Sequence, residues 1–144
     1  MVRISGKFAG LALAVALLGV QPAHAQEPVT LAMDTPTKVA GIEAVCTGVG
    51  LDARQDPRWA GYALKVEIAG AGGRYLGDEI ISLRQNGKTL LTADCAGPWI
   101  LFSIPPGRYE VEVETGGRAV KSAAFVAATG QGRIILRVPE DTAP

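Results

Sequence analysis

Short segments in which apolar and polar residues alternate, separated by turn residues, constrain the fold of this chain most. In residues 109–114 a tyrosine and two valines alternate with three glutamates. That period of two is typical of a β-strand with one buried face and one solvated face. Residues 62–69 repeat the pattern, with Lys65 and Glu67 on the expected solvated face. The glutamates of the first segment are expected to form an exposed face that meets Arg or Lys side chains of a neighbouring strand: Glu110, Glu112 and Glu114.

Seven or so strands are expected, joined mostly by short turns. Asn86-Gly87 suits the positive φ angles of a type I′ hairpin turn, and Gly41 predicts a bulge in the first strand. The one helix candidate covers residues 52–60, where Asp52 would cap a short helix. These features predict an all-β fold, an antiparallel β-sandwich. The candidate strands are residues 38–46, 62–69, 79–84, 89–94, 99–104, 108–115, 118–126 and 133–138.

The first 25 residues have the layout of a secretory signal peptide. Two basic residues precede an uncharged apolar run at residues 8–20, and a small-x-small triplet ends at Ala25. This layout predicts cleavage between Ala25 and Gln26. The run is shorter than the roughly 20 residues that a membrane helix needs, and no cysteine comes directly after it. The protein is therefore expected to be periplasmic or secreted, with no membrane insertion after cleavage.

The remaining chain is expected to form one domain. Residues 26–37 contain two prolines and no sustained period, which predicts a loose N-terminal arm. Residues 38–139 would form the sandwich, and residues 140–144 a frayed C-terminal tail.

Cys46 and Cys95 are the two cysteines of the chain. An even number in an oxidising compartment predicts a single intramolecular disulfide. Closing a loop of about 50 residues would contribute roughly 4 kcal/mol in the chain-entropy model. A thioredoxin-like redox pair needs cysteines two residues apart, so a structural bond is favoured.

Charge and histidine content argue against several classes of function. The chain has 14 basic and 14 acidic side chains, so no long-range field attracts nucleic acid. Cleavage of the signal peptide would remove His24, the only histidine, and with it Ser-His and Cys-His catalysis and every histidine-ligated metal site. We therefore expect a protein that is not an enzyme. The serines of the mature chain lie in predicted strands and outside any G-x-S-x-G elbow: Ser82, Ser103 and Ser122.

Two further patterns could suggest a cofactor or a metal site, and we expect neither. Residues 48–53 match G-x-G-x-x-A, but a dinucleotide loop needs a long helix after it, and Pro57 interrupts one. Asp78, Glu79 and Asp94 would lie near one end of the Asn-Gly hairpin. No calcium-loop motif accompanies them, and we interpret them as solvated carboxylates at strand ends.

Aromatic residues near strand ends and loops are the candidate ligand-binding side chains. A pyranose can stack its apolar face on such a ring when the ring is exposed. The alternative is that the rings fill the core, which we favour for Trp99 beside the disulfide and leave open for Trp59. The candidates are Trp59, Tyr62, Tyr75 and Trp99.

Three motifs and the Asn-Gly hairpin carry a resemblance to a known family. They are GRYLGD at residues 73–78, GPW at 97–99 and PPGRY at 105–109, the last followed by Glu-Val-Glu-Val. With them the chain resembles the carboxypeptidase regulatory-like domain over residues 45–138, in particular small exported bacterial proteins with a GVG-LD-R segment. The resemblance implies a Greek-key sandwich of seven or eight strands without catalytic machinery, in a group often placed with starch-binding-like folds. Its motif residues are Tyr75, Asp78, Gly97, Pro98, Trp99, Pro105, Pro106, Gly107 and Tyr109.

We therefore expect a non-enzymatic exported module whose partner is an unknown protein or a glycan. The first hypothesis is a protein-interaction or envelope-accessory role, which predicts an exposed patch without an aromatic groove. The alternative is a carbohydrate-binding module, which predicts at least two of the four candidate rings coplanar and facing solvent.

Overall fold

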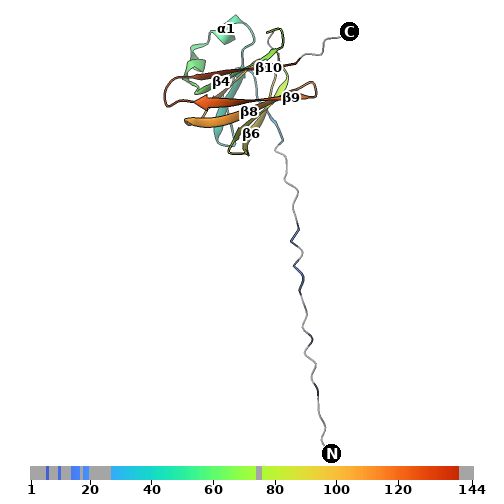
Figure 1. The fold of residues 1–144 in the computed structure, drawn as a ribbon. Coiled ribbons are helices and arrows are strands. Elements are labelled where there is room, and N and C mark those ends of the chain that lie inside the picture. Colours follow the sequence, from blue (N-terminus) through green and yellow to red (C-terminus); the bar gives the residue numbers. More distant parts are fainter. Residues whose placement is uncertain are drawn as a thin grey trace, which may run out of the picture.

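Two five-stranded sheets face each other in the computed structural model, which describes residues 27–73 and 76–139 together with positions 6, 10, 14–16, 18 and 19 (Figure 1). The strand order is β1-β6-β5-β8-β9 in the first sheet and β10-β4-β7-β3-β2 in the second. The predicted all-β sandwich is confirmed. The strands are β1 (Val29–Thr30), β2 (Thr37–Val39), β3 (Ile42–Thr47), β4 (Leu64–Gly70), β5 (Glu79–Gln85), β6 (Lys88–Cys95), β7 (Trp99–Ser103), β8 (Gly107–Thr115), β9 (Arg118–Val126) and β10 (Gly132–Val138).

The sheets are mixed rather than strictly antiparallel. β1 pairs in parallel with β6, and β10 pairs in parallel with β4 over its whole length. The other pairings between neighbouring strands are antiparallel. The expectation of an antiparallel sandwich fails at β10 because β9 and β10 belong to different sheets, so the connection between them is not a hairpin within one sheet. Alternation along a single strand carries no information about the direction of its neighbour.

Turn chemistry explains one correct hairpin and one missed hairpin. Asn86 and Gly87 have φ angles of 52° and 75°, as the predicted type I′ turn requires. Residues 38–46 were expected to form one bulged strand, but they form the hairpin of β2 and β3. Ala40 and Gly41 turn the chain with φ angles of 51° and 82°. Alanine rarely adopts a left-handed conformation, so this turn has no clear signature in the sequence.

The helical segment differs from the expected single helix. It consists of α1 (Leu51–Arg54) and a separate 3₁₀ helix, η1 (Pro57–Gly61). Asp52 does not cap α1, because Gly50 holds the N-cap position and makes no side-chain hydrogen bond. Asp56 instead caps η1 by accepting the backbone N–H of Arg58 at 2.9 Å.

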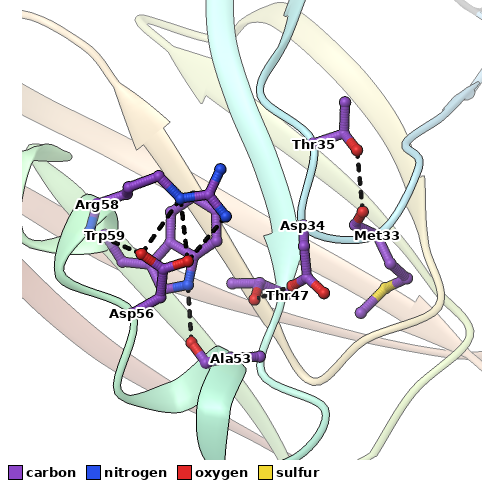
Figure 2. Close-up of polar contacts among 8 residues, drawn as sticks. All are labelled: Met33, Asp34, Thr35, Thr47, Ala53, Asp56, Arg58 and Trp59. Carbon is purple, nitrogen blue, oxygen red and sulfur yellow. Dashed lines mark hydrogen bonds and ion pairs between the residues drawn. The ribbon is translucent and has the colours of Figure 1, made fainter.

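The expected loose arm is tied to the sandwich from β1 onward, which corrects the domain boundary at residue 38. β1 pairs with β6, and Leu31 is buried in the core. Thr47, which lies on β3 next to Cys46, donates its hydroxyl to the Asp34 carboxylate at 2.5 Å (Figure 2). Backbone pairing and single side chains hold this segment, and neither produces a hydrophobic period.

The core lies between the sheets and is closed by the predicted disulfide. Cys46 of β3 and Cys95 of β6 join the second sheet to the first, with a Cα–Cα distance of 5.6 Å. The backbone N–H of Gly97 donates to Cys46 Sγ at 3.3 Å. A Cβ at Gly97 would lie 2.5 Å from the carbonyl oxygen of Thr47, so only glycine fits here. The largest fully buried apolar side chains are Phe102, Leu64, Ile68, Ile81, Leu83, Leu91, Ile100 and Leu101.

Candidate functional site

Three of the four candidate aromatic residues are buried. The exposed fractions are 4% for Trp59, 7% for Tyr62 and 6% for Trp99, and Tyr75 lies outside the described residues. The rings of Trp59 and Tyr62 meet edge to face, with an interplanar angle of 63°. The expectation of coplanar, solvent-facing rings is therefore wrong for this group. Together with Val45 and Leu101 the three residues form a second small core on the outer face of the second sheet.

The loop from α1 to η1 covers these rings. Trp59 donates its indole N–H to the carbonyl oxygen of Ala53 at 2.8 Å, as Figure 2 shows. Gln131 donates to the carbonyl oxygens of Trp59 and Tyr62 at 2.7 and 3.0 Å. Burial, with a hydrogen bond to the Glu43 carboxylate, raises the pKa of Tyr62 to about 12. Every described ring of the expected platform thus has a structural role.

An ion cluster closes the neighbouring part of this face. Glu67 of β4 is buried, which corrects its expected place on a solvated face. Lys65 Nζ lies 3.3 Å from Glu67 Oε1, and Arg133 of β10 donates from Nε to Glu67 Oε2 at 2.8 Å. Lys65 Nζ also lies 3.5 Å from the ring centroid of Trp99. The buried charge of Glu67 is compensated inside the protein by Lys65 and Arg133, as stability requires.

The acidic residues near the Asn-Gly hairpin do not form a metal site. Within the described ranges, no group of three or more Asp, Glu, His or Cys residues is placed to hold a metal ion. Glu79 was interpreted as a solvated carboxylate, but its exposed fraction is 0% and it points into the core opposite Cys95. Neither of its carboxyl oxygens has a hydrogen-bond partner among the residues that the structure describes. Burial, reinforced by Asp78 and Asp94, raises the pKa of Glu79 to about 8.

The outer face of the first sheet is left open, and it carries the expected row of glutamates. Arg84 Nη1 lies 3.7 Å from Glu110 Oε1 and 3.3 Å from Glu112 Oε2. Lys121 Nζ lies 3.5 Å from Glu112 Oε2. The prediction that these carboxylates meet Arg and Lys of neighbouring strands is confirmed for Glu110 and Glu112.

A groove lies at one end of this face, and we call it the β8–β9 groove. It has a volume of about 430 Å³, within the range of small-molecule sites. It is built by the end of β5, the turn between β5 and β6, the start of β8 and the end of β9. Strand register places Arg84, Glu110 and Ala123 in one row and Arg108 opposite Phe125 in the next. The lining residues are Arg84, Gln85, Asn86, Gly87, Arg108, Tyr109, Glu110, Ala123, Ala124 and Phe125.

Two side chains of the β8–β9 groove are left for a ligand. The ring of Phe125 is 66% exposed although its strand neighbours Ala124 and Val126 are buried. Arg108 is exposed, and its guanidinium has no ion-pair partner in the portion of the chain that the structure describes. The Arg84 side chain is held more firmly, because it also donates to Thr89 Oγ1 at 3.2 Å. The groove thus combines a held ion pair with an open ring and an open cation.

Sequence reasoning missed both open residues, although one of them had a readable signal. The buried positions of β9 near its end are Ala124 and Val126, so Phe125 falls on the parity of the solvated face. A large aromatic residue on that parity departs from the polar side chains that the solvated face of such a strand carries. Arg108 had no signal of its own, because only the register with Phe125 gives it significance.

The motif residues behind the family resemblance serve the fold where they are described. Tyr109 donates its hydroxyl to the carbonyl oxygen of Pro105 at 2.7 Å and so closes the turn into β8. The carbonyl oxygen of Pro98 accepts the backbone N–H of Ile68 at 2.8 Å. Asp78 turns the chain before β5 with a φ of 61°. These contacts within the fold explain the spacing of the motif residues, and no ligand is needed to explain it.

Comparison with known proteins leaves the family open. No protein-family model matches the chain, and no curated protein matches it significantly. No helix among the described residues is long and apolar enough to span a bilayer. The β8–β9 groove is therefore the feature from which a function is inferred.

Proposed function

We propose that the protein is a non-enzymatic binding module, exported from the cell, whose β8–β9 groove binds carbohydrate. One observation carries the proposal: Phe125 and Arg108 lie opposite each other on neighbouring strands, both are exposed, and the Arg108 guanidinium has no ion-pair partner among the described residues. An exposed aromatic ring forgoes roughly 25 cal/mol for each Å² that burial would remove from water. Such a ring is explained by a ligand that covers it.

The composition of the groove favours a polyhydroxylated ligand over a peptide. Among the described lining residues, Phe125 is the one large apolar side chain with an open face, and the other open or rim side chains are guanidinium, amide and carboxylate groups. Planar polar groups of this kind donate to and accept from sugar hydroxyls, and Gln85 and Asn86 supply both functions at once. A peptide anchored by hydrophobic burial would find little area here, because peptide interfaces depend on desolvated apolar pockets.

A protein-interaction role, as an envelope-accessory module, is the second candidate. It is favoured by two exposed apolar side chains, Val49 in the loop before α1 and Leu51 at the first position of α1. They lie on a different part of the molecule from the groove lining. Substitutions in the groove would therefore leave this second function intact.

Export is supported by the signal-like leader and by the disulfide. The cleavage residues Ala25 and Gln26 lie outside the described residues. The Cys46–Cys95 bond is of a kind that persists in oxidising compartments such as the periplasm. A mature protein that begins at Gln26 is expected, and mass spectrometry of the exported protein checks it. An intact mass that retains residues 1–25 would contradict export by this signal.

Replacing Phe125 by alanine is expected to weaken carbohydrate binding at least about tenfold, because the covered ring contributes on the order of 2 kcal/mol. Calorimetric titration of the purified protein with a panel of neutral and acidic oligosaccharides measures the affinity. Ile135→Ala is the matched control, since Ile135 is an exposed apolar residue of β10 on the other sheet. Equal losses in both variants, or no saturable binding across the panel, would overturn the proposal.

A further inference from the structure

We infer that the β8–β9 groove selects acidic sugars, with the ligand carboxylate bound by Arg108 and the sugar ring stacked on Phe125. The inference rests on the proposed carbohydrate function and names the class of sugar. It follows from which charges of the groove are already compensated and which are not.

The charges of the groove are unequally satisfied. Arg84 faces two carboxylates, Glu110 at 3.7 Å and Glu112 at 3.3 Å, so its charge is compensated within the protein. Glu112 is further held by Lys121 at 3.5 Å. Among the described residues that line the groove, Arg108 is the cation without a carboxylate partner. A ligand that carries its own carboxylate supplies what Arg108 lacks.

The position of Arg108 suits a carboxylate attached to a sugar ring. Arg108 and Phe125 are directly opposite on antiparallel strands, where Cβ atoms are about 5 Å apart. A hexuronate presents an apolar ring face and a carboxylate on the same ring, so one sugar unit can engage both side chains. The guanidinium fork binds a carboxylate through two parallel N–H···O bonds, which a methyl ester cannot match.

The remaining lining residues bind the rest of the sugar. Gln85 donates its side-chain amide to the backbone carbonyl oxygen of Arg108 at 3.4 Å, which holds the Gln85 side chain against the start of β8. Asn86 stands at the tip of the hairpin on the rim of the groove. Ala123 forms a small floor that leaves room for a ring against Phe125.

The test compares trigalacturonate with its fully methyl-esterified form, which differ only in the free carboxylates. The wild-type protein is expected to bind the acid at least tenfold more tightly than the ester, measured by calorimetry at constant ionic strength. Arg108→Gln is expected to abolish this preference while retaining binding of the ester through Phe125. Arg108→Lys keeps the charge without the fork and is expected to retain only part of the preference. Lys88→Gln is the matched control, because Lys88 lies at the same hairpin but outside the groove lining.

Each outcome either supports or overturns the binding of a ligand carboxylate by Arg108. Equal affinity for acid and ester, or an Arg108→Gln variant that keeps the preference, overturns the carboxylate assignment and leaves carbohydrate binding standing. A sulfated oligosaccharide that binds more tightly than trigalacturonate also overturns it, because the anion would then be a sulfate ester. If no saccharide binds, the proposed function fails together with the inference. Circular dichroism of each variant shows whether the sandwich remains folded.

Discussion

Replacing Cys46 and Cys95 together by serine is expected to lower the free energy of unfolding by about 4 kcal/mol. The bond closes a loop of 49 residues and joins β3 of one sheet to β6 of the other. Without it the unfolded chain regains the entropy of that loop. For a domain of this size such a loss corresponds to a fall in melting temperature of roughly 15 °C. Urea and thermal unfolding, followed by circular dichroism, measure it.

The Cys46→Ala/Cys95→Ala variant separates the cross-link from local packing. Both cysteines are fully buried, so serine adds the cost of a buried hydroxyl, whereas alanine leaves a small cavity. A loss shared by both double variants is the contribution of the bond. Unfolding of the wild-type protein in the presence of a reductant should reproduce it. Unchanged stability in all three experiments would contradict a structural role for the disulfide.

Stability is expected to fall as the pH rises from about 4.5 to about 8, because the Glu79 carboxyl group is buried with no hydrogen-bond partner among the described residues. Its folded-state pKa is raised to about 8 from an ordinary value of 4.5. Below pH 4.5 the carboxyl group is protonated in both states, so it makes the stability independent of pH there. Between the two values only the unfolded state ionises, so folding loses about 1.4 kcal/mol for each pH unit. Above pH 8 the loss is complete.

Glu79→Gln should therefore be more stable than the wild-type protein at pH 8 and similar to it at pH 4. Glutamine keeps the shape of the side chain but has no charge to bury. Asp94→Asn is the matched control, because it removes one neighbouring carboxylate and is expected to produce a smaller effect of the same sign. Urea unfolding at a series of pH values measures the difference. A stability difference between Glu79→Gln and wild type that is constant with pH would show that Glu79 does not titrate in this window.

The sequence predicted what local alternation and turn chemistry determine. The wet face of β8 and the turn at Asn86-Gly87 follow from periodicity and from the residues that tolerate positive φ. The disulfide followed from counting cysteines. The β2–β3 turn was missed because Ala40 does not favour the left-handed conformation that it adopts.

Features that depend on long-range pairing were out of reach of the sequence. The parallel pairing of β10 with β4 joins residues far apart in the chain, and nothing in either strand encodes its direction. Glu67 reads as a solvated residue of an alternating strand until Arg133 of β10 reaches it. Glu79 shows the same error, since a carboxylate at the start of a strand resembles a surface residue and yet points into the core.

The candidate site moved from the tryptophans to the β8–β9 groove because long-range packing decides which rings are buried. Trp59 and Trp99 were plausible sugar platforms because both lie at strand ends or loops, but the loop of α1 and η1 folds over them. Covering that outer face uses three of the aromatic rings for stability. Among the described residues, the outer face of the first sheet carries one exposed ring, Phe125, beside an exposed cation, and this contrast between the two faces is the reason for choosing the β8–β9 groove as the candidate site.

The central claim is that ligand binds on the β8–β9 groove and not on the face that carries the tryptophans. The most direct test is to record backbone amide chemical shifts of ¹⁵N-labelled protein during titration with the tightest-binding oligosaccharide of the panel. The account predicts saturable shifts at residues 85–87, 108–110 and 123–125, with small shifts at residues 48–62. Shifts concentrated around Trp59 and Trp99, with the groove residues unmoved, would contradict it.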